Sequence, residues 1–170
     1  MSQRWLITGS SRGLGRALSE AVLQAGHQLI ATARDPAQLE HLSRQFGKSV
    51  CVTPLDVTDP AAATRAMGIA VERFGGLDVL VNTAGYGNVN SVEDTPLEDF
   101  RRQIETNLFG TIIVTKAAIT LMRQQRSGHI IQFSSVGAES ALRAAPPIQR
   151  PNGVLRDSRK CWPGKWRSSV

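Results

Sequence analysis

Thr8-Gly9-Ser10-Ser11-Arg12-Gly13-Leu14-Gly15 is the stretch that decides the fold of this sequence. It follows a short apolar run at residues 4–8 and precedes a segment of helical spacing at residues 13–25. A glycine-rich turn between a strand and a helix lets the backbone approach a pyrophosphate, and the helix N-terminus offers free N–H groups. The Gly-x-x-x-Gly-x-Gly spacing lacks the Gly-Lys-Ser/Thr ending of a P-loop. The stretch therefore predicts a dinucleotide-binding turn, although a glycine triplet can also be only a turn.

The residues around this turn alternate between short apolar runs and segments of helical spacing. Strands are expected at residues 4–8, 27–33, 49–54, 77–82 and 128–134, and helices at about 13–25, 35–46, 59–74 and 97–125. Asp35-Pro36 and Asp59-Pro60 each combine a helix N-cap with proline at the first helical position. Strands that alternate with helices predict an α/β fold: a Rossmann-like doubly wound parallel sheet, incomplete, with about five strands.

Length and charge divide the chain into two parts. With 170 residues and 41% apolar composition, the chain is long enough for one domain with a core and too short for two ordinary ones. Residues 138–170 hold seven basic and two acidic residues, a balance of +5 out of the total net charge of +6, together with half of the eight prolines. We expect a dinucleotide-binding Rossmann domain at residues 1–137 and a basic, disordered tail at residues 138–170.

The composition argues against several classes of protein. No run approaches the roughly 18 apolar residues of a membrane span, and the N-terminus shows neither a signal-peptide core nor a cleavage site. Cys51 and Cys161 lie far apart without the neighbours of a metal site. We expect a cytoplasmic protein with no metal and no membrane partner. The basic tail could bind nucleic acid in a salt-dependent way, but the nearly neutral body does not favour this.

Five motifs, in order along the first 137 residues, resemble those of the short-chain dehydrogenase/reductase family. They are the glycine signature, Leu55-Asp56-Val57-Thr58, Asn82-Thr83-Ala84-Gly85, Asn107 within Glu105-Thr106-Asn107-Leu108-Phe109-Gly110, and Ser135 within Phe133-Ser134-Ser135-Val136-Gly137. Thr83 stands where the family usually has a second asparagine, and a hydroxyl can keep part of that hydrogen bonding. Taken singly, Asp56 could be a loop cap, Asn107 a polar residue on a helix face and Ser135 a strand-end serine. Their common order favours the family.

The resemblance implies hydride transfer between a nicotinamide cofactor and a small carbonyl compound or secondary alcohol. Ser135 would polarise the substrate oxygen, Asn107 would hold a water that relays protons, and Asp56 would contact the adenine of the cofactor. Intact family members are expected to be homo-oligomers. The residues expected to bind the cofactor are Gly9, Ser11, Arg12, Gly13, Leu14, Gly15, Arg34, Asp56, Val57, Asn82, Ala84 and Gly85.

Charge at the end of the second strand favours NADP over NAD. An acidic side chain there binds the ribose 2′-hydroxyl of NAD, whereas an arginine accommodates the 2′-phosphate of NADP. Here Ala33 takes the acidic position, Arg34 follows it, and Arg12 adds a second cation in the glycine turn. Asp35 is better explained as the cap of the next helix. The alternative is that Arg34 is a solvated surface residue and that the cofactor is NAD.

The tyrosine and lysine of the family's catalytic tetrad are missing from this chain. The Tyr-x-x-x-Lys motif would begin about thirteen residues after Ser135, where the chain has Ile148 and, four residues later, Asn152. The only tyrosine, Tyr86, is followed four residues later by Asn90. Because a lysine ammonium is needed to bring the tyrosine pKa of about 10 toward neutrality, we expect no useful turnover from this chain.

The tail from about residue 138 suggests a shifted reading frame. When the third base of each codon is read with the first two bases of the next, the codons from Pro147 onward allow the string YSAAKWGVEGFSEVLAGEVAVLG, which contains Tyr-x-x-x-Lys. Cys161-Trp162-Pro163 allows only Leu-Ala in this frame, although other positions offer several choices. A one-base deletion just after Ser135 would account for the family spacing. The nucleotide sequence decides this hypothesis.

A truncated sheet has two further consequences. Without the elements that follow in the family, apolar surface on the fifth strand stays uncovered, so poor stability and aggregation are expected. The alternative function is that of a non-catalytic nucleotide-binding fragment, which would associate with an intact family member through the helix containing Asn107.

Overall fold

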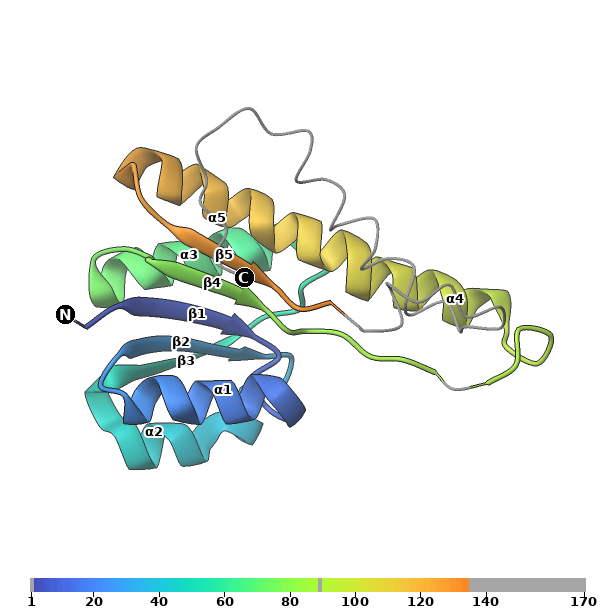
Figure 1. Ribbon diagram of the computed structural model, residues 1–170, viewed down its shortest axis with the longest axis horizontal. Coiled ribbons are helices and arrows are strands. Elements are labelled where there is room, and N and C mark those ends of the chain that lie inside the picture. Colours follow the sequence, from blue (N-terminus) through green and yellow to red (C-terminus); the bar gives the residue numbers. More distant parts are fainter. Residues whose placement is uncertain (1, 89, 135–170) are drawn as a thin grey trace.

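The computed structural model describes residues 2–88 and 90–134 of the chain. These residues contain the strands and helices that the sequence predicts (Figure 1). Ser135, the tail, the boundary expected after residue 137, and the positions Ile148 and Asn152 lie outside them. The frameshift hypothesis falls there as well and stays a prediction.

Five parallel strands of the described residues form one sheet in the order β3-β2-β1-β4-β5. The strands are β1 (Arg4–Thr8), β2 (Gln28–Ala33), β3 (Val50–Pro54), β4 (Val79–Asn82) and β5 (His129–Gln132). In β1, Leu6 lies beside Ile30 of β2 and Leu80 of β4. The chain builds outward from β1 in one direction and then, from β4, in the other, which is the doubly wound arrangement. The predicted fold class is confirmed.

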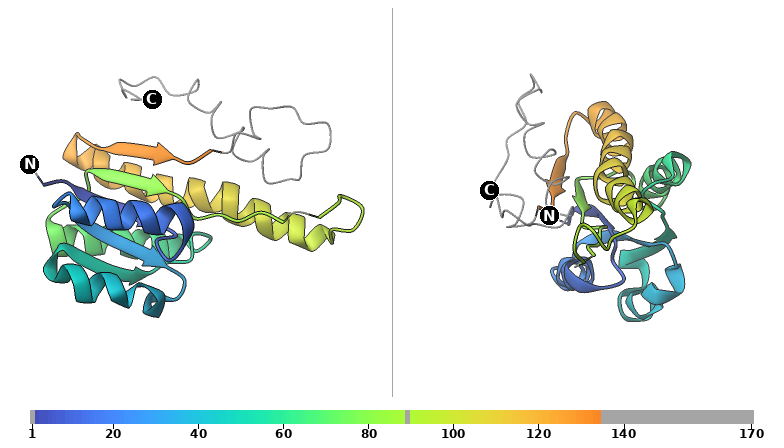
Figure 2. Two further views of the ribbon diagram at one scale, coloured as in Figure 1. Left: turned by 60° about the horizontal axis from the view of Figure 1, so that its bottom comes forward. Right: turned by 90° about the vertical axis from the view of Figure 1, so that its right-hand side faces the viewer.

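Helices cover both faces of the sheet (Figures 1 and 2). The α-helices are α1 (Gly13–Gln24), α2 (Glu40–Phe46), α3 (Pro60–Phe74), α4 (Leu97–Ile104) and α5 (Thr111–Gln125), and η1 (Pro36–Leu39) and η2 (Gly47–Ser49) are 3₁₀ turns. The helices α1 and α2 lie on one face, whereas α3 and α5 pack against each other on the other face. In both figures α4 extends beyond the carboxyl ends of the strands.

Alternating side chains of the strands contribute to two separate cores. In β1, Leu6 packs into the core beneath α3 and α5, whereas Ile7 packs into the core beneath α1 and α2. Both side chains are completely buried. Because helices cover both faces of the central strands, their sequences are nearly continuous apolar runs, as in Val79-Leu80-Val81.

Two aspartates begin helical segments as the sequence predicts. The backbone N–H of Ala37 donates to Asp35 Oδ1 at 3.0 Å, and that of Ala61 donates to Asp59 Oδ1 at 2.8 Å. A proline follows each aspartate, at a position where the helix needs no N–H donor. After Asp35 the chain makes the 3₁₀ turn η1 before α2, so the single helix expected at residues 35–46 is divided in two.

A π-helical turn, η3 (Glu105–Gly110), joins α4 and α5 into one continuous helix. Met122 lies 19 residues after Gln103, and at about 100° per residue a regular α-helix would place the two side chains about 100° apart. The π-turn holds one extra residue and absorbs this rotation. As a result the whole helix buries one stripe: Gln103, Asn107, Gly110, Thr111, Val114, Ala118 and Met122. The sequence predicted the helix at 97–125 but not its π-turn.

Among the described residues, the helical run Leu97–Gln125 is long and apolar enough to cross a membrane, judged by length and composition only. Its most apolar window is 28% buried. A core helix of a globular protein passes the same test, and α5 packs here against α3 and β4. The run is therefore a weak indication of a membrane span, and the expected absence of a membrane partner stays a prediction.

The strand β5 lies at one edge of the described sheet. It pairs with β4, and no other described strand pairs with it. Ile131 of this strand and Phe133 just beyond it are 39% and 40% exposed. Exposed apolar side chains along a strand edge favour association between chains, and the expected aggregation stays a prediction.

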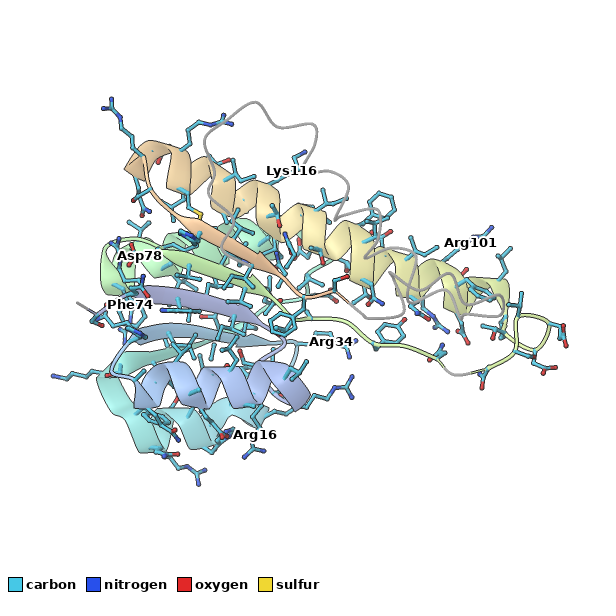
Figure 3. All side chains as sticks on the ribbon, viewed as in Figure 1. Arg16, Arg34, Phe74, Asp78, Arg101 and Lys116 are labelled. Carbon is cyan, nitrogen blue, oxygen red and sulfur yellow. The ribbon has the colours of Figure 1, made fainter. Side chains whose placement is uncertain are left out.

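An ion pair ties β1 to the start of β4 at the amino end of the sheet, opposite to Arg34 (Figure 3). Arg4 Nε and Nη2 donate to the two carboxylate oxygens of Asp78 at 2.9 and 2.6 Å, and the Arg4 backbone N–H donates to Asp78 Oδ2 at 2.8 Å. The side-chain hydrogen bonds from Arg4 are the main reason that the pKa of Asp78 lies below its ordinary value. Asp78 therefore stabilises the fold as an anion.

We expect Asp78→Asn to lower the free energy of unfolding by about 2 kcal/mol at neutral pH, because charge-assisted hydrogen bonds are lost. The pKa of Asp78 is lower in the folded state than in the unfolded state. The Asp78 charge therefore contributes fully to the free energy of unfolding above the unfolded-state pKa of about 3.9, and this contribution is lost as the pH falls through the folded-state pKa. In urea titrations the difference between parent and variant should therefore shrink below about pH 4.

The control for this substitution is Glu40→Gln, which removes an exposed ion pair between Glu40 and Arg44 on α2. Exposed pairs of this kind contribute little, so the control should change the free energy of unfolding by less than about 0.5 kcal/mol. A difference between parent and Asp78→Asn that stays constant from neutral to acid pH would contradict the role assigned to the Asp78 charge.

Candidate functional site

The glycine turn after β1 and the turn after β4 meet where the strand order changes direction. The hydroxyl of Thr8, at the end of β1, accepts hydrogen bonds from the backbone N–H groups of Thr83 and Ala84 at 3.1 and 3.0 Å. The Thr83 hydroxyl donates in return to the Thr8 carbonyl. In open α/β sheets, ligands bind in the crevice beyond the carboxyl ends of the strands at such a point. These hydrogen bonds therefore fix the base of a candidate site.

Close packing requires two glycines of the turn. Gly9 has a φ of +71°, and a Cβ there would lie 3.0 Å from Ala84 Cα. A Cβ on Gly15 would lie 2.6 Å from Thr83 Oγ1 and would overlap the carbonyl oxygen of Gly9. Gly13, with a φ of +56°, is required by its backbone conformation, and a Cβ there would meet no heavy atom within 4 Å. The turn is tightly packed against β4 on one side and open at Gly13.

The N-terminus of α1 is available to an anion. Arg12 is its extended N-cap residue and makes no side-chain capping hydrogen bond, and no acidic residue lies in the first turn. Ser11 is half-buried, Arg12 and Gly13 are exposed, and Leu14 is 67% exposed. The helix has 12 residues, and its uncapped N–H groups and dipole together favour a phosphate group at this end.

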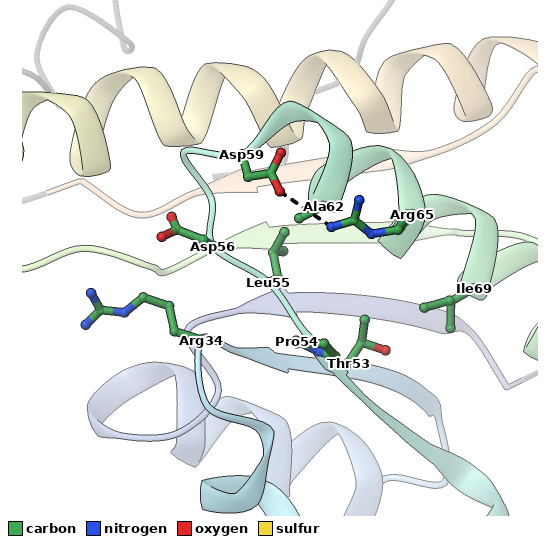
Figure 4. Close-up of a pocket in the computed structure, with 9 residues that line it drawn as sticks. All are labelled: Arg34, Thr53, Pro54, Leu55, Asp56, Asp59, Ala62, Arg65 and Ile69. Atoms are coloured by element: carbon green, nitrogen blue, oxygen red, sulfur yellow. Dashed lines mark hydrogen bonds and ion pairs between the residues drawn. The ribbon is translucent and has the colours of Figure 1, made fainter.

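A groove of about 490 Å³ opens beyond the ends of β2 and β3 (Figure 4). Arg34 and Asp56 are among its lining residues, and Asp56 Oδ1 accepts hydrogen bonds from the backbone N–H and the hydroxyl of Thr58 at 2.9 and 2.8 Å. Within the described part of the chain, no hydrogen bond to the second carboxylate oxygen of Asp56 is found. Within residues 2–88 and 90–134, neither Arg34 nor Arg12 pairs with a carboxylate. The remaining lining residues are Thr53, Pro54, Leu55, Asp59, Ala62, Arg65 and Ile69.

The other charged groups of the groove are Asp59 and Arg65, and they neutralise each other. Arg65 Nη2 lies 3.4 Å from Asp59 Oδ2. The backbone N–H groups of Ala61 and Ala62, at the start of α3, are the main reason that the pKa of Asp59 lies below its ordinary value. Among the described residues of the groove, Arg34 is consequently the cation without a carboxylate partner.

Asn107 holds the loop that follows β4. The backbone N–H of Tyr86 donates to Asn107 Oδ1 at 3.1 Å, and Asn107 Nδ2 donates to the Tyr86 carbonyl at 2.7 Å. Gly85 passes so close that a Cβ there would lie 3.0 Å from Asn107 Oδ1. Both polar atoms of the side chain are therefore used to position the loop. Any water that Asn107 holds would have to share these atoms or bind at its backbone carbonyl, which accepts from the Thr111 hydroxyl at 2.9 Å.

Asn82 connects the sheet to α5. Asn82 Nδ2 donates to Thr115 Oγ1 and to Gln132 Oε1, both at 3.0 Å, and Gln132 Nε2 donates to Thr115 Oγ1 at 2.9 Å. This triangle joins β4, β5 and α5. The Asn82 side chain thus turns toward α5 and β5, and its place among the cofactor-binding residues stays a prediction.

The structure gathers the expected residues into two neighbouring groups. The glycine turn, Ala84 and Gly85 lie beyond β1 and β4, and Arg34 and Asp56 lie at the groove beyond β2 and β3. Val57 is buried, at 7% exposure, and Ser135 lies outside the described residues.

Two contributors were missed from the sequence: the Thr8 hydroxyl and the Tyr86 backbone. Thr8 stands inside a motif that the sequence singled out, so its position within the motif was the available signal. The sequence carries no mark of the Tyr86 contact, because any residue supplies the same backbone groups.

Comparison with known proteins extends these observations. A profile of the short chain dehydrogenase family matches residues 3–147. The Oxidoreductase BOA17 of Botryotinia fuckeliana is 50% identical over 138 residues, which are 81% of this chain and 50% of that protein. The Sepiapterin reductase of Chlorobaculum tepidum is 38% identical over 148 residues, with 81% of this chain and 61% of that protein covered.

A solved structure shows the same likeness in three dimensions. A short-chain dehydrogenase from Streptomyces avermitilis superposes with a TM-score of 0.87 at 31% identity, covering 95% of this chain and 59% of that one. The chain spans about half the length of the curated relatives that match it over most of its residues. The profile match runs to residue 147, and the domain boundary expected after residue 137 stays a prediction.

Proposed function

Because this chain belongs to the short chain dehydrogenase family of oxidoreductases, we propose that its glycine turn and groove bind NADP. The proposed activity of the whole protein is hydride transfer between the nicotinamide and a small carbonyl compound or secondary alcohol. The observations that carry the proposal are the open glycine turn at the uncapped N-terminus of α1 and Arg34 at the groove, which pairs with no carboxylate among the described residues.

The residues present fit the cofactor. The pyrophosphate would sit at Gly13, where a Cβ would meet nothing within 4 Å, and would accept hydrogen bonds from the first N–H groups of α1. Arg34 would pair with the 2′-phosphate, with Arg12 as the second cation. Asp56 would accept a hydrogen bond from the adenine at its second carboxylate oxygen, since Thr58 occupies the first. This arrangement would neutralise the phosphates at the carboxyl ends of β1 and β2.

The bound cofactor would supply or accept the hydride, and the chain's own residues would position the partners. Thr8 and Thr83 hold the glycine turn against the turn after β4, so these two turns would present a fixed surface to the cofactor. Asn107 orders the Tyr86 loop on the nicotinamide side. Ser135, in the role that the family resemblance implies, would hydrogen-bond to the substrate oxygen.

Arg34→Ala tests the choice of cofactor. We expect the variant to bind NADPH about 10- to 100-fold more weakly than the parent, because one or two charge-assisted hydrogen bonds to the 2′-phosphate are lost. Its affinity for NADH, which lacks that phosphate, should change by less than about threefold. Isothermal titration of the purified chain with each nucleotide measures both dissociation constants.

The matched control is Arg44→Ala, which removes an arginine that pairs with Glu40 on the exposed side of α2. It should leave both affinities within about twofold of the parent, since Arg44 does not line the groove. A parent chain that binds NADH more tightly than NADPH would refute the preference for NADP.

The second candidate function is nucleotide binding without catalysis. Its support is the sequence at residues 148 and 152, where Ile148 and Asn152 stand in place of the tyrosine and lysine of the family motif. No other side chain in the sequence supplies that acid and its neighbouring ammonium at the family spacing. NADPH binding without oxidation of NADPH in the presence of a panel of carbonyl compounds would favour this function.

A further inference from the structure

Gly110 is a point of close approach between the helix of Asn107 and the loop that follows β3. Its φ of −56° and ψ of −45° are ordinary helical values, so the backbone does not demand glycine. Space demands it instead: a Cβ on Gly110 would lie 2.5 Å from Val57 Cγ2 and 3.1 Å from Val57 Cβ. The backbone of the helix therefore packs directly on Val57.

The loop that receives this contact is held in one conformation. Val57 is buried in the core that it shares with Leu55 and Val114. Its neighbour Asp56 accepts two hydrogen bonds from Thr58, and the Asp56 carbonyl accepts a third from the backbone N–H of Asp59 at 3.1 Å. A displacement of Val57 must therefore also displace Asp56, which lines the groove.

The other side of the same π-turn reaches the loop after β4. Asn107 lies three residues before Gly110 in η3 and makes both hydrogen bonds to the Tyr86 backbone. The Thr111 hydroxyl donates to the Asn107 carbonyl, which fixes Asn107 to the first turn of α5. One six-residue turn thus contacts the Asp56 loop at one end and the Tyr86 loop near the other.

We propose that Gly110 is a positioning residue, which couples the adenine side of the groove to Asn107 and the Tyr86 loop. A ligand in the groove beside Asp56 restricts the position of Val57, which packs on Gly110. Because Gly110 and Asn107 belong to the same π-turn, the position of Asn107 is restricted as well. This inference rests on the proposed nucleotide-binding function. It goes beyond that function because it predicts that binding at the adenine side makes the distant Tyr86 loop more ordered.

Hydrogen exchange of the Tyr86 amide tests the coupling, because this N–H is held by Asn107. The probe is adenosine 2′,5′-bisphosphate, which represents only the adenine side of NADP. On the full 170-residue chain we expect saturating probe to slow exchange at Tyr86 by about fivefold or more. In Gly110→Ala, exchange at Tyr86 should be about tenfold faster without ligand, and the probe should no longer slow it.

A second-site variant separates positioning from general damage. Val57→Ala in the Gly110→Ala background removes Cγ2, the Val57 atom that the new Cβ would meet at 2.5 Å, so it should bring Tyr86 exchange back toward the parent rate. If Gly110→Ala alone does not fold, Val57→Ala alone opens the contact, and the effect of the probe on Tyr86 should then disappear. An effect that persists in Val57→Ala overturns the proposal.

The reference amide is that of Ala84, which is bound to the Thr8 hydroxyl and lies outside the proposed path. The control substitution is Gly68→Ala in α3, where a Cβ would meet no heavy atom within 4 Å, and it should leave Tyr86 exchange unchanged. Equal acceleration at Tyr86 and Ala84 in Gly110→Ala, or none at either, overturns the proposal. A parent that does not bind the probe refutes the nucleotide-binding function, while the ligand-free comparison of the variants still decides the coupling.

Discussion

Gly15→Ala is expected to abolish tight nucleotide binding, with at least about a 100-fold loss of NADPH affinity. The added Cβ would lie 2.6 Å from Thr83 Oγ1 and would overlap the carbonyl oxygen of Gly9. The first turn of α1 must then move away from β4, which takes its N–H groups out of the position that the pyrophosphate needs. Overpacking of this kind should also lower the free energy of unfolding by about 1 to 3 kcal/mol.

Titration with NADPH and urea unfolding of the same preparation measure the two effects separately. Gly68→Ala is the matched control, because it makes the same chemical change inside a helix with open space around the new Cβ. That control should keep the parent affinity and gain about 0.5 to 1 kcal/mol of stability, since alanine has the higher helix propensity. A folded Gly15→Ala chain that binds NADPH within about threefold of the parent would contradict this account of the turn.

Asn107→Ala should lower the free energy of unfolding by about 2 kcal/mol and release the loop after β4. The substitution leaves the partly buried N–H and carbonyl of Tyr86 without their shared partner, and each such group costs about 1 to 3 kcal/mol unless water reaches it. The Tyr86 amide should exchange at least about tenfold faster than in the parent. Urea unfolding and amide exchange give the two values.

Two further variants sharpen this experiment. Thr120→Ala removes an exposed hydroxyl from the same helix, where it donates to the Lys116 carbonyl, and should change stability by less than about 0.5 kcal/mol. Asn107→Asp keeps an acceptor for the Tyr86 N–H but sets a carboxylate oxygen against the Tyr86 carbonyl, so it should not rescue the loop. Unchanged Tyr86 exchange in Asn107→Ala would show that the two hydrogen bonds do not hold the loop.

Local sequence patterns were sufficient for most of the fold. Short apolar runs predicted the strands, and the run is continuous in β4 because helices cover both faces of the central strands. Asp35 and Asp59 predicted helix starts, because a side-chain cap and the following proline act within a few residues. Arg34 was predicted from charge at the end of the second strand and Asp56 from the family resemblance, and the structure places both in the lining of one groove.

The candidate site depends on contacts that no local pattern contains. The tie between Thr8 and Thr83 joins residues 75 positions apart, and the Tyr86 loop is held through backbone atoms that every residue has. The sequence named Asn107 as a holder of water, whereas the structure shows its side chain engaged with Tyr86. Whether Asn107 also takes part in proton relay stays a prediction.

For this protein the sequence alone determined the order of strands and helices, the position of the glycine turn and the charge at Arg34. These properties follow from local propensity, from capping and from side-chain periodicity. Only the tertiary structure explains the π-turn at Glu105–Gly110 and why the residue at its end must be glycine. The helix must keep one buried stripe from Gln103 to Met122 while its backbone rests on Val57, and that requirement arises only when the helix packs on the sheet.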